Sequence, residues 1–534
     1  MATCGQALVE LLSAHGVDTV FGIPGVHTVE LYRGFPRSGL RHITPRHEQG
    51  AGFMADGYAR ASGKSAACFI ITGPGLTNIA TALGQAYADS VPILVISSVN
   101  NAHELGLGEG RLHELPSQRN LMAGLTAFSH TLNRADEVSI VLSRAFSVFR
   151  STRPRPVHIE IPLDVIVAPV NERIPSRSAA VSFRPYPDPQ SIAAAADLLR
   201  KARRPLVVLG GGAQDAAEAA QHLVERLDAP AVLTINGKGV LPFGHPLSLG
   251  SSLPQAPLRD ELAVADVVLA VGTELGETDT LLFNERPQIG GKLIRVDMDP
   301  AQLASNAIAD VGIVADAEAA LRALDGALSD FTSADGSGRA RAASLRRAIE
   351  QRITPRQRLY QRILERVVQG APDTIIVGDS TQLIYGGNLT FEPRRPRSWF
   401  NATTGYGTLG YALPAALGAK LAQPGRPVLA VIGDGGLQFT IAELATAVEL
   451  ALPVPILVWN NHGYGEIKRY MAERNIPQIG VDIYTPDLLS IARGFGCAAV
   501  RARNLEELGA SVENAHRAGG PTLIEVDEAD AHSW

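Results

Sequence analysis

Two apolar stretches in the last quarter of the sequence decide its fold: PVLAVIGDGG at residues 427–436 and PVPILVWNNHG at residues 453–463. Each begins with a short hydrophobic run that predicts a buried strand, and each ends in glycine, aspartate or asparagine. Strands that are apolar throughout are typical of parallel sheets covered by helices on both faces. We therefore expect the polar residues that end both strands to lie at one edge of the same sheet, where α/β proteins bind ligands.

The same pattern of short apolar runs continues along the chain of 534 residues, which is long enough for about three domains. Polar segments containing proline or glycine, at 168–190 and 329–356, indicate linkers. We expect an α/β protein with three doubly wound parallel-sheet domains, at 1–170, 186–330 and 355–534. The other predicted strands are SAACFIIT (65–72), VPILVISS (91–98), RPLVVLG (204–210), ADVVLAVG (265–272), KLIRVD (292–297) and DTIIVGD (373–379).

The composition limits the binding partners and the cellular location that we expect. The net charge of −6 gives no basic surface for nucleic acid or for an anionic membrane, so we expect small molecules and other subunits as partners. Three cysteines, Cys4, Cys68 and Cys497, are too few and too scattered for a disulfide framework or a structural zinc site. The sequence shows neither a signal peptide nor a membrane span, so we expect a cytoplasmic protein.

The residues that end the two opening strands suit a magnesium diphosphate complex. Mg²⁺ prefers octahedral oxygen ligands, and it takes few of them from protein and several from phosphate. Asp434 would supply a carboxylate, and the Asn460–Gly463 loop an amide oxygen and a backbone carbonyl; 24 residues separate Gly435 from Asn460. Glycines after a strand let backbone N–H groups approach phosphate at the start of the next helix.

This order and spacing resemble the signature of the thiamine-diphosphate-dependent enzyme superfamily, and the resemblance covers the whole chain. It implies that Asp434, Asn461 and the carbonyl of Gly463 bind Mg²⁺. It also implies that the diphosphate contacts are Gly435, Gly436 and Gln382. The three expected domains then become a pyrimidine-binding, a central and a diphosphate-binding domain.

Two further segments resemble the superfamily's binding site for the cofactor's pyrimidine ring. In HEQGA at 47–51, followed by ADGYAR at 55–60, Glu48 matches the glutamate that hydrogen-bonds and activates the ring. In GYGTLG at 405–410, Gly407 matches the carbonyl contact and Leu409 the apolar support under the bent cofactor. Many relatives of the acetolactate synthase type have methionine in place of Leu409.

The superfamily also implies how subunits combine. Its activating glutamate and its metal-binding aspartate come from different subunits, so we expect a homodimer or homotetramer with active sites at the subunit interface. In the central domain, LGGGA at 209–213 is a weak nucleotide feature that an ordinary strand-to-helix turn also explains. The resemblance therefore implies thiamine diphosphate and Mg²⁺ as cofactors, whereas FAD, which acetolactate synthases carry, is possible but not expected.

The resemblance implies that the substrate is a 2-oxo acid, and one acidic residue, Glu466, suggests which 2-oxo acid it is. The chain resembles the acetolactate synthase branch, but its segment GTELGETDTLL at 272–282 lacks the arginine that those enzymes use to hold a second oxo acid. Glu466 stands where they place an apolar residue against the substrate side chain. A buried acid is costly unless it is paired, so Glu466 predicts a cationic substrate.

Together with IPGVHTVELY at 23–32 and GRLHELPSQ at 110–118, Glu466 resembles the decarboxylases of 5-guanidino-2-oxopentanoate, the oxo acid of arginine. We therefore expect a carbon–carbon lyase of arginine catabolism that forms 4-guanidinobutanal and CO2 without oxidation. Glu114, Glu277 and Asp279 are secondary candidates for binding the guanidinium group. In the opposing interpretation, Glu466 is solvent-exposed or pairs with Lys468 or Arg469.

Imidazole titrates near neutral pH, so His113, or His27, could protonate the carbon from which CO2 departs. Either histidine could equally be structural. Two other functions stay open at this stage: a carboligase like the acetolactate synthases, which joins two 2-oxo acid or aldehyde units, and a non-catalytic flavin- or nucleotide-binding protein.

Overall fold

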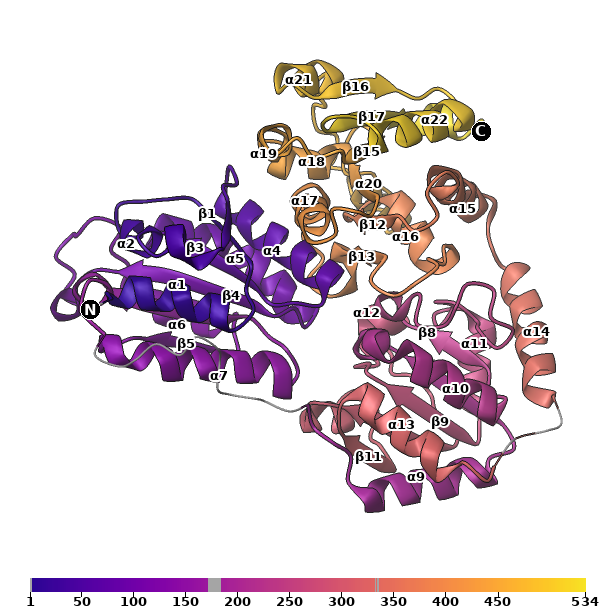
Figure 1. Ribbon diagram of the computed structural model, residues 1–534. Coiled ribbons are helices and arrows are strands. Elements are labelled where there is room, and N and C mark those ends of the chain that lie inside the picture. The colour runs from indigo at the N-terminus through magenta and orange to yellow at the C-terminus, as the bar shows by residue number, and fades with distance from the viewer. Residues whose placement is uncertain (1, 171–183, 332, 334–335) are drawn as a thin grey trace.

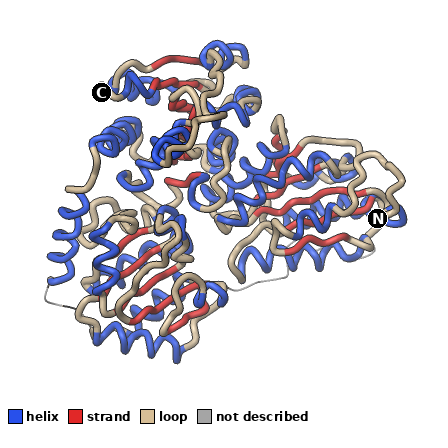
Figure 2. Tube along the Cα trace, turned by 180° about the vertical axis from the view of Figure 1, so that it is seen from behind, coloured by secondary structure: helices blue, strands red, loops and turns tan. Residues whose placement is uncertain are grey.

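The computed structural model of the chain describes residues 2–170, 184–331, 333 and 336–534. Its strands form three parallel sheets, one in each third of the chain, and helices cover both faces of each sheet (Figure 1). Figure 2 shows the same three sheets from behind. The predicted fold class, three doubly wound α/β units, is therefore confirmed. Most of the first expected linker lies outside the described residues.

The N-terminal sheet has the strand order β2-β1-β3-β4-β6-β5. One face packs against α1 and α7, and the other against α4 and α5, so each face has its own apolar core. The strands are β1 (Thr19–Gly22), β2 (Arg41–Ile43), β3 (Ala66–Ile70), β4 (Ile93–Val99), β5 (Phe128–Thr131) and β6 (Val157–Pro162). The helices are α1 (Cys4–Ala14), α2 (Val29–Tyr32), α3 (Phe35–Ser38), α4 (Glu48–Ser62), α5 (Pro74–Ala88), α6 (Gln118–Ala123), α7 (Val138–Ser151) and α8 (Leu163–Ile166).

The C-terminal sheet repeats this topology, because its order β13-β12-β14-β15-β17-β16 visits its own six strands in the same sequence. The strands are β12 (Ile375–Gly378), β13 (Trp399–Asn401), β14 (Val428–Gly433), β15 (Pro455–Asn460), β16 (Ala498–Arg501) and β17 (Thr522–Asp527). The helices are α15 (Pro355–Val368), α16 (Gln382–Thr390), α17 (Ala412–Ala422), α18 (Asp434–Thr440), α19 (Glu443–Glu449), α20 (Gly465–Glu473), α21 (Leu488–Gly494), α22 (Leu505–His516) and α23 (Glu528–Ala531).

Helices α4 and α17 occupy equivalent places in the two sheets, and they pack against each other. Small residues on both helices allow a very close approach. A Cβ atom on Gly57 would lie 1.9 Å from the carbonyl oxygen of Ala415, and one on Gly418 would lie 1.9 Å from that of Met54. This reciprocal contact joins the N-terminal and C-terminal domains into one continuous apolar core.

The central sheet has the order β11-β10-β9-β7-β8 and a core of its own. The segment expected as a second linker, 329–356, contains helix α14, whose Arg346 donates to the carbonyl oxygen of Pro246 at 2.7 Å. The strands are β7 (Pro205–Leu209), β8 (Ala231–Leu233), β9 (Val267–Val271), β10 (Lys292–Asp297) and β11 (Val311–Val314). The helices are α9 (Pro189–Lys201), α10 (Ala217–Leu227), α11 (Ala256–Val264), α12 (Glu277–Thr280), α13 (Ala317–Ala327) and α14 (Ser337–Glu350).

None of the helices within the described ranges combines the length and the hydropathy that a membrane crossing requires.

Candidate functional site

Asp434 is the first residue of α18, directly after β14, and it is buried. Strands β14 and β15 are neighbours in register, with Gly433 opposite Trp459, so the loops that follow them meet at one sheet edge. Asp434 Oδ1 accepts from the backbone N–H of Asn461 at 3.3 Å, and Oδ2 accepts from that of Gly463 at 3.1 Å. A third donor, the Thr485 hydroxyl, lies 2.8 Å from Oδ2 and was not anticipated from the sequence.

Three oxygen atoms converge beside this carboxylate. The side-chain oxygen of Asn461 lies 3.2 Å from Asp434 Oδ1 and 2.8 Å from the carbonyl oxygen of Gly463. Oxygens without a proton between them repel one another at these distances unless a cation lies among them; an amide turned by 180° would instead donate to both. Oxygen ligands of octahedral Mg²⁺ are about 3 Å apart along an edge of the octahedron, so the arrangement fits that ion.

The two asparagines have different environments. Asn460 is buried, donates to Glu525 Oε1 at 2.7 Å and accepts from the backbone N–H of His462 at 3.0 Å, so it shapes the loop. Asn461 directs its amide nitrogen to Gln382 Oε1 at 3.3 Å, which leaves its oxygen facing Asp434 and Gly463. The sequence predicted the pair of asparagines as a unit, and the structure separates them.

Gln382 begins α16 and lines an open depression of about 430 Å³ with Asn461, Gly465 and Arg469. Gly435 and Gly436 form the first turn of α18. A Cβ atom on Gly435 would lie 2.9 Å from the Tyr464 ring, and one on Gly436 would lie 3.0 Å from Asp379 Oδ1. Close packing by itself therefore favours glycine at both positions.

Asp379 holds the segment that contains Gly407 and Leu409. Its buried carboxylate accepts from the backbone N–H groups of Ser380 at 2.9 Å, Gly410 at 3.3 Å and Ala412 at 3.0 Å. Burial raises the pKa of Asp379 to about 6, against the lowering effect of these donors. Gly407 has φ of +73°, a left-handed conformation that favours glycine, and Leu409 is half-buried. Asp379 ends the predicted strand at 373–379, so its position could have been noticed from the sequence.

Glu48 is the first residue of α4, and its Oε2 atom accepts from Asn78 Nδ2 on α5 at 2.9 Å. Its Oε1 atom is 3.1 Å from where a Cβ atom on Gly75 would lie, so the carboxylate rests against the first turn of α5. The start of α4 is fixed by Glu443 on α19, which accepts from the backbone N–H of His47 at 3.1 Å. Neither Asn78 nor Glu443 was anticipated from the sequence.

His113 lies against the start of α5, where Glu48 also lies, and His27 lies beside His113. His113 packs on Gly73, where a Cβ atom would lie 2.6 Å from the carbonyl oxygen of His113. The Nδ1 atoms of the two imidazoles are 3.3 Å apart. Burial lowers the pKa of His27, and the charge of His113 lowers it further. The structure thus brings Glu48 and both candidate histidines to one helix terminus.

Glu466 lies near the start of α20, and its carboxylate forms an ion pair with Arg469. The side chain of Glu466 is 36% exposed, that of Arg469 is 48% exposed, and Arg469 also pairs with Glu473 at 2.6 Å. The structure therefore contains the pair between Glu466 and Arg469 that the opposing interpretation of Glu466 predicted. The negative charge of Glu466 helps to raise the pKa of Tyr385 on α16, after the larger effect of burial.

The other acidic candidates lie elsewhere. Glu114 accepts from the backbone N–H groups of Gly108 and Arg111 in an exposed loop. Glu277 accepts from that of Asn284 at 3.2 Å, and Asp279 lines a cavity between the N-terminal and central domains. Within the described residues of one chain, no hydrogen bond or ion pair joins Glu48 or His113 to Asp434, Asn461 or Gly463.

Family models match each of the three domains of the chain. They are described as the N-terminal thiamine pyrophosphate binding domain, the central domain and the C-terminal thiamine pyrophosphate binding domain of thiamine pyrophosphate enzymes, at residues 2–122, 192–324 and 380–526.

Curated relatives align along the whole chain. A probable 2-ketoarginine decarboxylase of Pseudomonas aeruginosa is 50% identical, covering 99% of this chain and 94% of its own. An acetolactate synthase of Mycobacterium bovis is 31% identical over 100% of this chain and 89% of its own. The large subunit of acetolactate synthase isozyme 1 of Escherichia coli is 32% identical over 98% and 93%.

Proposed function

The chain belongs to the thiamine pyrophosphate enzyme family, and from that premise we propose that it decarboxylates 5-guanidino-2-oxopentanoate to 4-guanidinobutanal and CO2. The observation that carries the proposal is the 50% identity, over nearly the whole chain, to a probable decarboxylase of this oxo acid. The cofactors of the family are thiamine diphosphate and Mg²⁺.

We assign the metal to Asp434, Asn461 and the carbonyl of Gly463. Their three oxygens are spaced for one octahedral ion, and Asp434 is held by the Thr485 hydroxyl and by two backbone N–H groups. Gln382, Gly435 and Gly436 would border the diphosphate. The C-terminal domain therefore anchors the charged end of the cofactor.

When bound, thiamine diphosphate supplies the carbon that attacks the oxo group and takes up the electron pair released with CO2. The chain's own residues would control protons around that carbon. Glu48 would hold a proton at the pyrimidine ring nitrogen, and Asn78 fixes the carboxylate in place. The pair of His113 and His27 would supply the proton that the aldehyde product gains, because both imidazoles lie at the same turn of α5 as Glu48.

Substrate selection would fall to Glu466. In the free enzyme its carboxylate already binds a guanidinium group, that of Arg469, and this contact supports the assignment. Arg469 keeps a second partner in Glu473, so a substrate guanidinium can replace it at Glu466 without leaving Arg469 unpaired. An exposed ion pair is worth only about 0–1 kcal/mol, so the exchange costs little.

The substrate is tested by comparing kcat/KM for 5-guanidino-2-oxopentanoate, pyruvate and a branched 2-oxo acid, with the enzyme saturated in thiamine diphosphate and Mg²⁺. We expect the guanidino compound to be preferred by at least tenfold. A preference for pyruvate would refute the assignment.

A second candidate function is carboligation. Acetolactate synthases that are 31% and 32% identical over nearly the whole chain favour it. Product analysis separates the two reactions, because carboligation yields a 2-hydroxyketone, whereas decarboxylation yields one aldehyde for each CO2.

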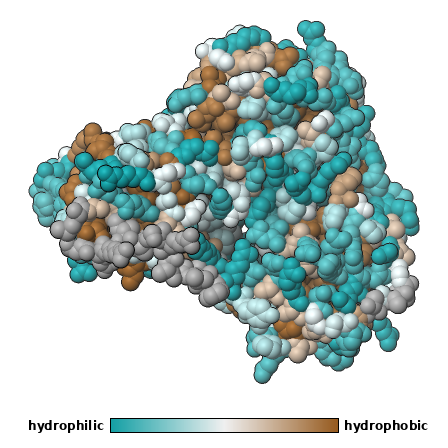
Figure 3. All heavy atoms as spheres, in the orientation of Figure 1, coloured by the Kyte–Doolittle hydropathy of each residue, from teal (hydrophilic) through white to brown (hydrophobic). Residues whose placement is uncertain are grey.

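We further propose that two subunits share each active site. Exposed apolar side chains surround both halves of the site, and such patches are typical of interfaces. Figure 3 shows hydrophobic side chains on the surface of the C-terminal domain and along the N-terminal domain. The apolar residues beside the two halves are Val26 and Leu112, next to the histidines, and Phe439, Ile467 and Tyr470, on α18 and α20.

Complementation tests this arrangement. Glu48→Gln and Asp434→Ala should each be inactive alone. Mixed subunits should regain about a quarter of the wild-type activity, because half of the dimers are hybrid and each hybrid has one intact site. A mixture that stays inactive, although hybrids form, would place the whole site in one chain. The same experiment, followed by size measurement, separates a homodimer from a homotetramer.

Cys4, Cys68 and Cys497 are all buried free thiols, which supports a reducing cytoplasmic location as a further proposal.

A further inference from the structure

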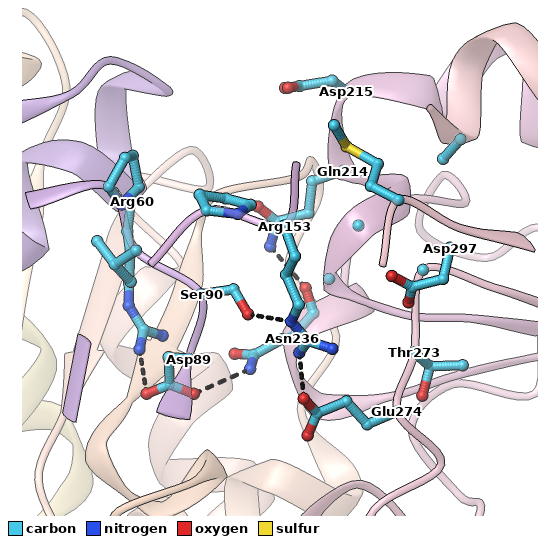
Figure 4. Close-up of a pocket in the computed structure, with 18 of the residues that line it drawn as sticks. Arg60, Asp89, Ser90, Arg153, Gln214, Asp215, Asn236, Thr273, Glu274 and Asp297 are labelled. Carbon is cyan, nitrogen blue, oxygen red and sulfur yellow. Dashed lines mark hydrogen bonds and ion pairs between the residues drawn. The ribbon is translucent and has the colours of Figure 1, made fainter. Parts of the chain in front are cut away.

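A cavity of about 280 Å³ lies between the N-terminal and central domains and is also bordered by Arg397, Phe400 and Thr404 of the C-terminal domain. It opens at the edge of the central sheet where β7, β9 and β10 end, which is where α/β sheets bind ligands. Figure 4 shows charged side chains such as Arg153 and Asp297 in its wall, together with uncharged ones such as Asn236. The charges at this edge decide what the cavity can hold.

Most of these charges neutralise one another in the wall. Arg397 pairs with Asp215 at 2.8 Å, Arg184 pairs with Asp316 at 2.9 Å, and Arg60 pairs with Asp89. Arg60 also pairs with the buried Asp56 at 2.8 Å, so none of these three cations is left for a ligand. The remaining charges fall into two groups of opposite sign.

The negative group is Asp297 and Asp279. Asp297, at the end of β10, is 8% exposed; its Oδ1 atom accepts from the backbone N–H of Asp299 at 2.9 Å, and its Oδ2 atom has no hydrogen bond within the described residues. Asp279 accepts only from the Thr273 hydroxyl, at 2.8 Å. Burial raises the pKa of both carboxyls, that of Asp279 to about 6, and the positive charge of Arg153 lowers both in part.

Arg295 is not an ion-pair partner of Asp297, although its charge also lowers the pKa of Asp297. Its guanidinium group donates to the carbonyl oxygens of Ser305 at 2.6 Å and of Thr273 at 2.8 Å. The Arg295 guanidinium group is therefore hydrogen-bonded to backbone carbonyls and not to Asp297. The Asp297 Oδ2 atom faces the cavity without a donor from the described chain, so it can accept a hydrogen bond from a ligand.

The positive group is Arg153 and Arg155, which share one carboxylate. Arg153 Nη2 lies 2.5 Å and Arg155 Nη2 3.5 Å from Glu274 Oε1, so two guanidinium groups face one acid and leave one positive charge. Arg153 also donates to Ser90 at 2.8 Å, but its Nη1 atom is buried and has no hydrogen-bond partner in the described chain. In Figure 4 the carboxylate of Asp297 points toward Arg153 across the cavity.

The dinucleotide FAD does not fit this arrangement. Its diphosphate would need free backbone N–H groups at the turn after β7. There the N–H of Gly210 donates to Val271 at 2.9 Å, that of Gly212 to Gly272 at 3.0 Å, and that of Ala213 back to Gly210 at 3.0 Å. The uncompensated acids would also repel a diphosphate. The volume of about 280 Å³ lies below the roughly 300–1,000 Å³ of pockets that hold drug-sized ligands.

We propose that this cavity is a binding site for a free α-amino acid in its zwitterionic form, with the carboxylate on Arg153 and the ammonium group on Asp297. Arg153 Nη1 and Asp297 Oδ2 lack hydrogen-bond partners in the described chain, and their opposite charges match those of such a ligand. Because Arg153 belongs to the N-terminal domain and Asp297 to the central domain, the ligand would bridge the two. This site does not depend on the proposed substrate.

The test uses the full chain saturated with thiamine diphosphate and Mg²⁺. Each of the twenty L-amino acids, together with ADP and FAD, is screened by thermal shift, and the best ligand is then titrated by calorimetry. We expect at least one amino acid to bind. Asp297→Asn and Arg153→Met should each weaken it by at least tenfold, whereas Asp197→Asn, at an exposed pair on α9, should not.

Two further measurements keep the result specific. Glu466→Gln should leave amino acid affinity unchanged, which separates this cavity from the proposed substrate site. For the wild type, the amine that lacks the carboxylate of the best amino acid should bind at least tenfold more weakly, and this comparison needs no variant to fold. If no amino acid binds, if ADP or FAD binds more tightly, or if Asp297→Asn leaves the affinity unchanged, the proposal is wrong.

Discussion

Replacing Glu466 by glutamine removes the charge that we expect to bind the substrate guanidinium, and keeps the size of the side chain. Hydrogen bonds to charged groups contribute about 1.5–3 kcal/mol each. From this we subtract about 0–1 kcal/mol for the exposed pair with Arg469, which the substrate must displace. The net loss of about 0.5–3 kcal/mol corresponds to about a 2- to 160-fold fall in kcat/KM for 5-guanidino-2-oxopentanoate.

The assay compares kcat/KM for this substrate with kcat/KM for 2-oxohexanoate, an uncharged linear oxo acid. Glu466→Gln should lower the ratio of the two values by the stated factor, mainly through the guanidino compound. Glu473→Gln is the matched control, because it removes the same charge from the same helix at a residue that also contacts Arg469. If Glu466→Gln keeps the wild-type ratio, Glu466 does not bind the substrate cation.

Three further changes test the site and the fold. Glu48→Gln should lower kcat by at least 100-fold while thiamine diphosphate still binds, as seen by calorimetry; unaltered turnover would remove Glu48 from catalysis. Asp434→Ala should abolish tight binding of Mg²⁺ and the cofactor together, and wild-type affinity would show that another residue holds the metal. Gly57→Ala places a Cβ atom 1.9 Å from the carbonyl oxygen of Ala415 and should cost about 1–3 kcal/mol of stability in thermal unfolding, whereas Gly519→Ala meets nothing within 4 Å and should cost little.

The sequence predicted the eight strands with long apolar runs, because their signal is local. Strands such as β14 and β15 are apolar on both faces, so a short window reveals them. Nine strands of the described chain were not predicted. Four of them, β2, β5, β11 and β16, are partly exposed, whereas β1, β6, β8, β13 and β17 are buried but are short or carry charged residues such as Glu160 and Glu525. Helix α14 was expected as a linker because most of its residues are polar or exposed, so its small apolar face is not evident from the sequence.

The candidate site shows the same division between local and distant information. The metal-binding pattern at Asp434 and Asn461 is local, since the two residues end adjacent strands of one sheet. Thr485 and Asn78 reach the site from separate segments, and nothing in their neighbouring residues indicates the contact. The pairing of Glu466 with Arg469 depends on rotamers on one helix turn, so the sequence left it as one of several alternatives.

The most direct test of the proposed function is the stoichiometry of products from 5-guanidino-2-oxopentanoate, followed by NMR with and without thiamine diphosphate and Mg²⁺. The proposed reaction gives one CO2 and one 4-guanidinobutanal for each oxo acid consumed, and none when either cofactor is withheld. A 2-hydroxyketone as the main product, or no conversion by the fully loaded enzyme, would contradict it.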